Sequence, residues 1–165
     1  MASKAQQQMI EPGQRAPEFS LRDMDGGSST LADLLAGGRT LLAFFKVTCP
    51  VCQYTFPYLE RLHKGAPDGA VRFVAVSQDD RRDTQEFLKQ HGVSFPALLD
   101  EDARGYPASN GFQIAHVPSM FLVEPDGRIS WASNGFSKAQ LADLGQRLGA
   151  TLFRPGEKVP EWQPG

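Results

Sequence analysis

The sequence predicts an α/β domain in which helices flank a central mixed β-sheet. Two continuous apolar runs of strand length, at 40–47 and 71–76, are typical of strands that are buried on both faces. Between and after these runs, apolar residues recur at helical spacing, so strands and helices alternate along the chain. Near the end, the turn residues Pro125-Asp126-Gly127 join two strand-like segments into a hairpin.

The elements are expected in the following order. A small hairpin comes first, because Phe19 and Leu21 are followed by the turn residues Asp25-Gly26-Gly27. Ser29 or Thr30 then caps a short helix over 31–35. The remaining elements are a strand at 40–47, a helix at 50–64, a strand at 71–76, a helix at 83–92, an extended piece at 95–99, a short helical region at 102–112, a strand at 119–124, its hairpin partner at 128–132, and a helix from Ser137 to about 149. Pro57 is expected to bend the helix at 50–64 rather than end it.

The size and composition of the chain indicate one globular domain. It has 165 residues, of which 41% are hydrophobic and 22% charged, and it needs neither a metal nor a disulfide to fold. We expect a flexible N-terminus over 1–11, the domain over 12–150, and an irregular tail rich in Pro and Gly over 151–165. Trp162 in that tail either docks on the domain or is a stray exposed aromatic.

The charge and hydropathy of the chain argue against several classes of partner. A formal net charge of −2 is unlike the basic surface of a nucleic-acid-binding protein. No apolar run has the length of a signal peptide or a membrane helix. The sequence as given therefore indicates a cytoplasmic protein, expected to be a monomer. A periplasmic or other extracytoplasmic location is the alternative, if an export signal has been removed.

The chain has only two cysteines, and both lie at the junction between the first buried strand and the following helix. Pro50 is expected at the first helical position, where its missing N–H costs nothing. Cys49 then lies at the helix cap, and Cys52 lies three residues further along on the same face. This spacing brings the two sulfur atoms within reach of a disulfide.

The two thiols are expected to differ in acidity. Cys49 faces the unpaired N–H groups and the positive end of the helix dipole, which favour the thiolate and lower its pKa. Cys52 lies one turn inside and is more shielded. An exposed thiolate attacks a disulfide, and a nearby buried thiol then resolves the mixed disulfide. The alternatives are two inert cysteines or half of a zinc site, but no second cysteine pair is present and His63, His91 and His116 are scattered. We therefore expect no metal.

Five motifs, taken in their order and spacing, resemble the thioredoxin-like redoxins over residues 12–150. They are PGQRAPEFSL at 12–21 followed by Asp25-Gly26, LLAFF at 41–45 leading into the cysteine pair, Phe56-Pro57, HVPS at 116–119, and FLVEPDG at 121–127. The resemblance is to the TlpA/ResA type of thiol–disulfide oxidoreductase and, through the N-terminal hairpin, to the AhpC/TSA redoxins. It implies a thioredoxin-like fold with an N-terminal β-hairpin extension.

The resemblance also implies how the site is built. Cys49 is the nucleophile and Cys52 the resolving thiol. Pro118 is a cis-proline facing them, and the Val117–Pro118 loop offers main-chain groups to an incoming peptide. Pro50 and Val51 complete the expected substrate-binding residues. The expected partners are a protein or small-molecule disulfide or dithiol and an upstream thiol reductant, with no cofactor beyond the Cys49–Cys52 disulfide itself.

The chain departs from this family at the positions that usually carry acids. Ala43 stands where thioredoxins have a buried Asp, and Thr55 stands where TlpA-type proteins often have a Glu. Deprotonation of Cys52 therefore lacks the usual general base, and we expect slow resolution of mixed disulfides. Lys46 either extends to solvent or acts as an electrostatic modulator that stabilises a thiolate.

Two other functions remain as alternatives. A thiol peroxidase of the peroxiredoxin type shares the hairpin, but if Cys52 were the peroxidatic residue, Phe45 and Cys49 would occupy the positions of its Pro and Thr, and Pro118 would lie near that of its Arg. A Cu(I)-binding module is the second alternative, because soft thiolates suit Cu(I) and His116 lies in the loop expected near the pair.

Overall fold

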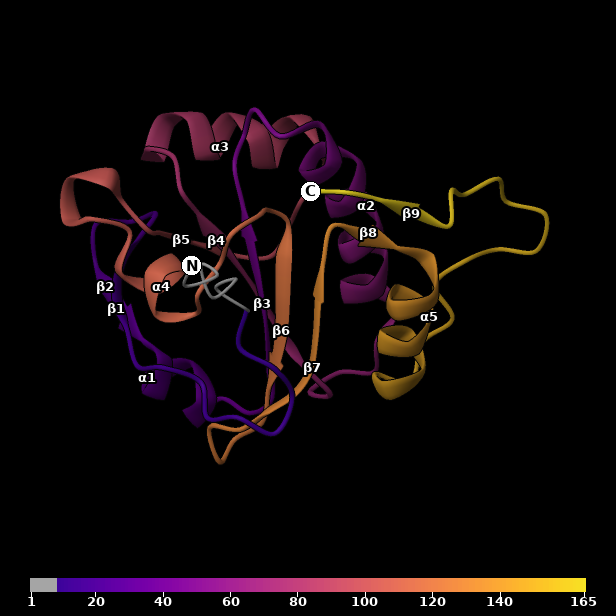
Figure 1. Cartoon of the computed structure of the whole chain (residues 1–165), viewed down its shortest axis with the longest axis horizontal. Coiled ribbons are helices and arrows are strands. Elements are labelled where there is room, and N and C mark those ends of the chain that lie inside the picture. Colours follow the sequence, from indigo (N-terminus) through magenta and orange to yellow (C-terminus); the bar gives the residue numbers. More distant parts are fainter. Residues whose placement is uncertain (1–8) are drawn as a thin grey trace, which may run out of the picture.

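The computed structural model of the chain describes residues 9–165. Its core is a seven-stranded mixed sheet with the strand order β2-β1-β5-β4-β3-β6-β7, and a separate two-stranded sheet pairs β8 with β9 (Figure 1). The predicted α/β class, with a central mixed sheet flanked by helices, is confirmed. Most of the segment expected to be flexible, 1–11, lies outside the described residues.

The strands and helices have the following bounds. The strands are β1 (Ser20–Asp23), β2 (Ser28–Thr30), β3 (Thr40–Phe45), β4 (Arg72–Ser77), β5 (Ala97–Leu99), β6 (Ser119–Val123), β7 (Ile129–Asn134), β8 (Phe136–Ser137) and β9 (Trp162–Gln163). The α-helices are α1 (Leu31–Ala36), α2 (Pro50–Gly65), α3 (Arg81–Gln90), α4 (Pro107–Gly111) and α5 (Lys138–Arg147), and η1 (Asp102–Arg104) is a 3-10 turn.

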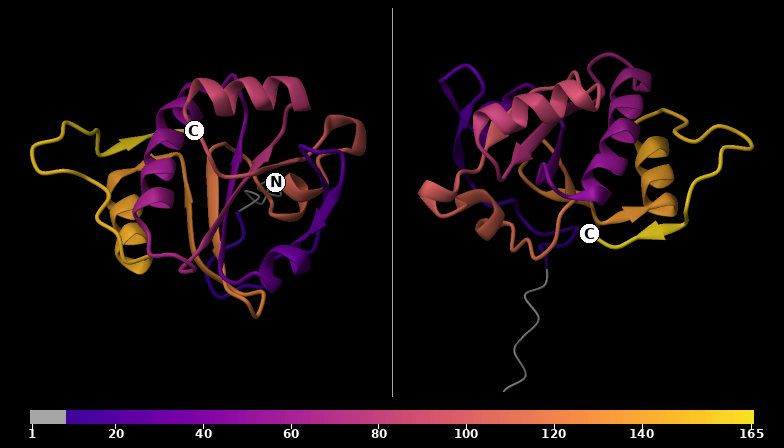
Figure 2. Two further views of the ribbon diagram at one scale, coloured as in Figure 1. Left: turned by 180° about the vertical axis from the view of Figure 1, so that it is seen from behind. Right: turned by 90° about the horizontal axis from the view of Figure 1, so that it is seen from above.

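Strand β3 lies at the centre of the sheet and contributes side chains to both cores. It pairs in parallel with β4 and antiparallel with β6. Because successive side chains of a strand point to opposite faces, Leu41, Ala43 and Phe45 pack with α2, α3 and α5, whereas Leu42 and Phe44 pack with α1 and α4. The two views in Figure 2 show helices on both sides of the sheet. The apolar run of β3 is uninterrupted because both faces of the strand are covered by helices.

Helix bounds differ from the expected ones by a few residues. The third helix begins at Arg81 rather than 83, because Asp80 caps it by accepting a hydrogen bond from the Asp83 N–H at 2.8 Å. The second helix continues through Pro57, as expected. The first is capped by Thr30, one of the two residues proposed, in a reciprocal capping box with Asp33.

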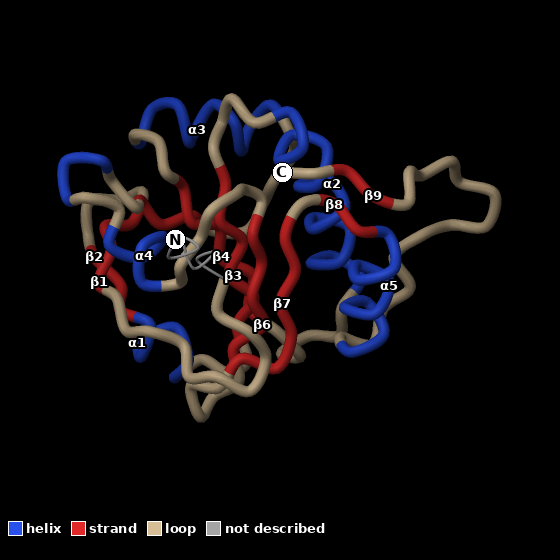
Figure 3. The backbone as a smooth tube through the Cα atoms, viewed as in Figure 1, coloured by secondary structure: helices blue, strands red, loops and turns tan. Residues whose placement is uncertain are grey.

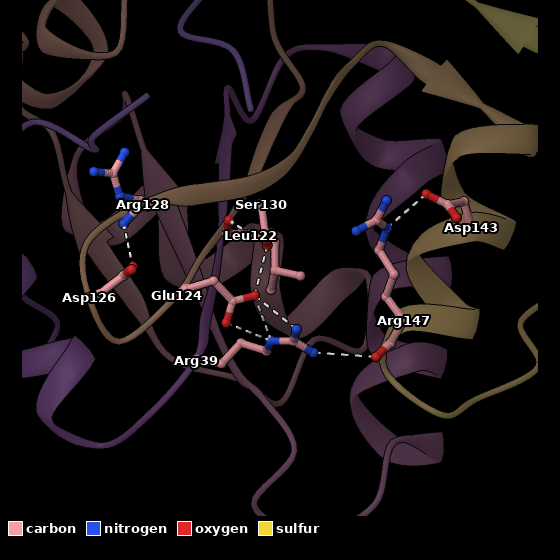
Figure 4. Close-up of polar contacts among 8 residues, drawn as sticks. All are labelled: Arg39, Leu122, Glu124, Asp126, Arg128, Ser130, Asp143 and Arg147. Atoms are coloured by element: carbon pink, nitrogen blue, oxygen red, sulfur yellow. Dashed lines mark hydrogen bonds and ion pairs between the residues drawn. The ribbon is translucent and has the colours of Figure 1, made fainter. Parts of the chain in front are cut away.

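A polar cluster joins the end of the sheet farthest from the cysteines to α5. Arg39, just before β3, donates from Nε to both carboxylate oxygens of Glu124 at 3.0 Å and from Nη1 to the Arg147 carbonyl at 3.3 Å (Figure 4). Ser130 Oγ donates to the same carboxylate at 2.8 Å. The cluster therefore connects the start of β3, the end of β6, the start of β7 and the end of α5.

The C-terminal tail is more regular than expected. After α5 it forms a wide loop and returns beside β8, where β9 pairs antiparallel with it (Figure 3). The expectation of an irregular tail is therefore wrong for Trp162 and Gln163. The Trp162 side chain remains 56% exposed, so the tail docks through its main chain rather than through this ring. None of the helices between residues 9 and 165 combines the length and the apolar character needed to cross a membrane.

Candidate active site

Cys49 occupies the N-cap of α2, where the carboxyl end of β3 leads into the helix. Its Sγ accepts a hydrogen bond from the Cys52 N–H at 3.2 Å, because the first N–H groups of a helix have no partner within the helix. The same sulfur donates to the Val117 carbonyl oxygen at 3.5 Å. Cys49 is half-buried and free. The geometry predicted for the cysteine pair at a strand-to-helix junction is thus present.

Cys52 has the opposite environment. Its side chain is 0% exposed, and burial raises the pKa of the Cys52 thiol far above its ordinary range. The hydrogen bond with Cys49 and the negative charge of Asp79 act in the same direction, whereas the Lys46 main chain opposes them. Cys52 is therefore a protonated thiol at neutral pH in the reduced protein.

The Val117–Pro118 loop faces the pair, and its peptide bond is cis. Pro118 is buried, and its carbonyl accepts the Gly135 N–H at 2.8 Å. The Ser119 hydroxyl donates to the His116 carbonyl at 2.6 Å and thereby closes the turn that precedes β6. The expected cis-proline is confirmed, and this loop places the Val117 carbonyl against Cys49.

The segment before Cys49 is held by two side chains that the sequence analysis did not single out. Asp79 Oδ2 accepts the Val47 N–H at 2.8 Å, and Gln53 Nε2 donates to the Val47 carbonyl at 2.9 Å. A signal for Asp79 was present: it follows a buried strand parallel to β3, and the carboxyl ends of parallel strands meet at one edge of a sheet. Asp79 is the acid whose charge raises the Cys52 pKa.

The other predicted residues lie around the pair in different environments. Pro50 and Lys46 are exposed, and Val51 is half-buried. Lys46 lines a pocket of about 230 Å³ together with His116 and Val117. The effect of Lys46 on a thiolate remains a prediction.

Neither of the two positions that lack the family's acids holds a proton acceptor. Thr55 is buried and its hydroxyl donates to the Val51 carbonyl within α2 at 2.7 Å, whereas Ala43 is part of the core beneath the helix. Across residues 9–165, no three His, Cys, Asp or Glu side chains gather in a way that suits a metal ion.

The AhpC/TSA family model matches residues 12–132. The chain belongs to this family. It is 30% identical to the thiol–disulfide oxidoreductase ResA of Bacillus subtilis over 93% of this chain and 82% of that protein. It is 27% identical to ResA of Halalkalibacterium halodurans over 84% and 77%, respectively.

A solved structure agrees with the fold. The thioredoxin domain of a thiol–disulfide oxidoreductase from Bacteroides vulgatus superposes with a TM-score of 0.73 at 22% identity, covering 84% of this chain and 97% of that domain. The predicted thioredoxin-like fold is therefore confirmed. The chain has the family, the fold and the closely spaced cysteine pair, Cys49 and Cys52, of a thiol–disulfide oxidoreductase. This is the function that the sequence predicted.

Proposed function

We propose that Cys49 is the attacking thiol, that Cys52 is the resolving thiol, and that the pair exchanges disulfides with protein or small-molecule substrates. The position of Cys49 Sγ is the observation that carries this assignment. It lies at the amino end of α2, accepts the Cys52 N–H at 3.2 Å and is half-buried, whereas Cys52 is fully buried. A helix N-terminus stabilises the thiolate that attack requires.

The proposed cycle balances in two steps. The Cys49 thiolate attacks one sulfur of a substrate disulfide, forms a mixed disulfide and expels the other sulfur as a thiolate, which takes up a proton. The Cys52 thiol then loses its proton and attacks Cys49 Sγ, which forms the Cys49–Cys52 disulfide and releases the second substrate thiol. The substrate gains the two electrons that the cysteine pair loses, and an external thiol reductant returns them. Because the two sulfurs carry the electron pair, the cycle requires no other redox group.

The high pKa of Cys52 sets the slow step of this cycle. Resolution requires the Cys52 thiolate, which burial disfavours, and neither Ala43 nor Thr55 supplies a carboxylate. We therefore expect the mixed disulfide on Cys49 to persist longer than when a carboxylate accepts the proton of the resolving thiol.

A trapping experiment tests the assignment. The Cys52→Ser variant, added to native lysate, should accumulate mixed disulfides on Cys49 that thiols release. The Cys49→Ser variant is the control and should hold nothing. Equal adducts on both variants would contradict the assigned roles, and a redox titration of the pair gives the direction of exchange.

The two alternatives give different results in the same assays. Catalysed loss of peroxide well above that caused by free cysteine would favour the peroxidase. Anaerobic Cu(I) titration in which affinity depends on Cys49 would favour a copper-binding module.

A further inference from the structure

The C-terminal tail runs along the main chain that leads from β7 to α5. The Lys138 N–H donates to the Glu161 carbonyl at 2.9 Å, Ser137 pairs with Trp162, and Phe136 pairs with Gln163. Continued in this antiparallel sense, Pro164 and Gly165 pass Gly135. A Cβ placed on Gly135 would lie 2.5 Å from the Gln163 carbonyl oxygen and 3.2 Å from the Gly165 nitrogen.

This path leads to the cis-proline loop. A Cβ on Gly165 would overlap the Val117 carbonyl oxygen and would lie 3.5 Å from the Pro118 nitrogen. Only a glycine fits at this distance, because a real Cβ does not approach a carbonyl oxygen so closely. The Val117 carbonyl is also the acceptor of the Cys49 thiol at 3.5 Å. The end of the tail and the Cys49 sulfur therefore contact the same main-chain carbonyl.

The tail covers the main-chain edge at Val117, and an extended substrate needs this edge. A polypeptide that binds by adding a strand uses the free main-chain groups of its receptor, and the loop at Val117 is where such groups face Cys49. In this structure Gly165, at the end of the paired tail, lies against the Val117 carbonyl. The chain's own tail thus takes the place of an incoming strand.

The tail leaves space beside the first turn of α2. Pro160 and Gln163 face Pro50, Val51 and Tyr54 across a mostly apolar pocket of about 280 Å³. A gap of this size beside Pro50, the residue that follows Cys49, accommodates a small substituent, whereas an extended peptide also needs the main-chain edge at Val117.

We propose that residues 160–165 act as a specificity element, which admits small disulfides to Cys49 and hinders polypeptide disulfides until the tail moves aside. The inference rests on the proposed function, because it assumes that Cys49 is the attacking thiol. We call the main-chain edge at Val117, which an extended substrate would pair with, the groove. While the tail is docked the groove is closed, so the apparent reactivity toward a strand-forming substrate equals the intrinsic reactivity multiplied by the fraction of molecules in which the groove is open. It leaves the intrinsic reactivity of the thiolate unchanged.

The test compares two substrates with the same leaving group. One is bis(2-hydroxyethyl) disulfide, and the other is an extended peptide whose central cysteine forms a mixed disulfide with 2-mercaptoethanol. Two variants uncover the groove: Gly165→Val, which places side-chain atoms against the Val117 carbonyl, and a chain that ends at Val159, which removes no buried side chain. Lys158→Gln is the matched control, because this exposed side chain lies just outside residues 160–165.

Both groove variants should react roughly tenfold faster with the peptide disulfide, as expected for a groove that is open about a tenth of the time, and at an unchanged rate with the small disulfide. The control should match the wild type with both substrates. Equal changes for the two substrates, or no change in either variant, would overturn the specificity role. Failure of the wild type to react with either disulfide would instead contradict the proposed function.

Discussion

The guanidinium of Arg61 on α2 binds the carboxylate of Glu157 in the C-terminal tail through two hydrogen bonds, of 2.8 and 3.0 Å. Arg61 also donates to the Leu152 carbonyl at 3.1 Å. Two parallel hydrogen bonds of this kind fix both the position and the orientation of the Glu157 carboxylate. The residues that follow Glu157 are therefore anchored to the same helix that carries Cys52.

Substitution of Glu157 should loosen the tail. The hydrogen bonds from Arg61 lower the pKa of Glu157, so the anchor should persist to below the ordinary glutamate pKa of about 4.3 and be lost as the pH falls through the lowered value. In Glu157→Gln, the Lys138 amide, which pairs with Glu161, should exchange its hydrogen faster at neutral pH. Unchanged exchange at Lys138 would show that the anchor does not hold β9. Lys158→Gln, at the neighbouring exposed position, is the control.

The stability of the reduced protein should fall in alkali because of Cys52. Its folded-state pKa is raised above the value in the unfolded chain, so its contribution is fully present below about pH 8.5 and is lost as the pH rises toward the folded value. Relative to Cys52→Ala, reduced wild type should lose about 2 kcal/mol between pH 7 and pH 10 in urea unfolding. A difference between the two proteins that stays constant with pH would contradict the raised pKa.

Removal of the negative charge at Asp79 should speed the resolving step. This carboxylate raises the Cys52 pKa, so Asp79→Asn should lower that pKa and shift the rise in resolution rate to lower pH. The measurement is stopped-flow release of a thiol from a mixed disulfide on Cys49 across the alkaline range. Asp80→Asn is the control, because asparagine still caps α3. A slower release in Asp79→Asn would instead assign this carboxylate to proton transfer from Cys52.

The cluster around Glu124 should contribute to stability without affecting the cysteines. Hydrogen bonds from Arg39 lower the pKa of Glu124, so its contribution is present above about pH 4.3 and is lost as the pH falls through the lowered value. Glu124→Gln should cost about 0.5–1 kcal/mol at neutral pH in urea unfolding. The more exposed pair in Figure 4 offers the control, since Asp143→Asn should cost less. If Cys49 reacted more slowly in Glu124→Gln, the cluster at the start of β3 would influence the cysteines beyond its other end, contrary to this prediction.

Local patterns were sufficient to predict the parts of the site that depend on neighbours in sequence. The apolar run before Cys49, Pro50 at the first helical position and the spacing to Cys52 are all contained within a few residues. Asp79 follows another strand, β4, and its contact with Val47 exists only after β4 has paired with β3.

The pairing of Trp162 and Gln163 within the tail was not predicted, for a related reason. Pro160 and Pro164 flank β9, and proline-rich segments in a sequence predict irregular chain. Trp162 and Gln163, which lie between these prolines, nevertheless form a strand because they pair with β8. The contact of Gly165 with Val117 links residues far apart in sequence, and no local pattern contains it.

The central position of β3 has a consequence for local unfolding. The strand that ends just before the active cysteines is paired on both sides and buried on both faces, so it belongs to the cooperative unit that opens only on global unfolding. The tail beyond Glu157 pairs through a single short strand and opens at far lower free energy. The groove can therefore be cleared and covered again many times while the scaffold that positions Cys49 stays intact.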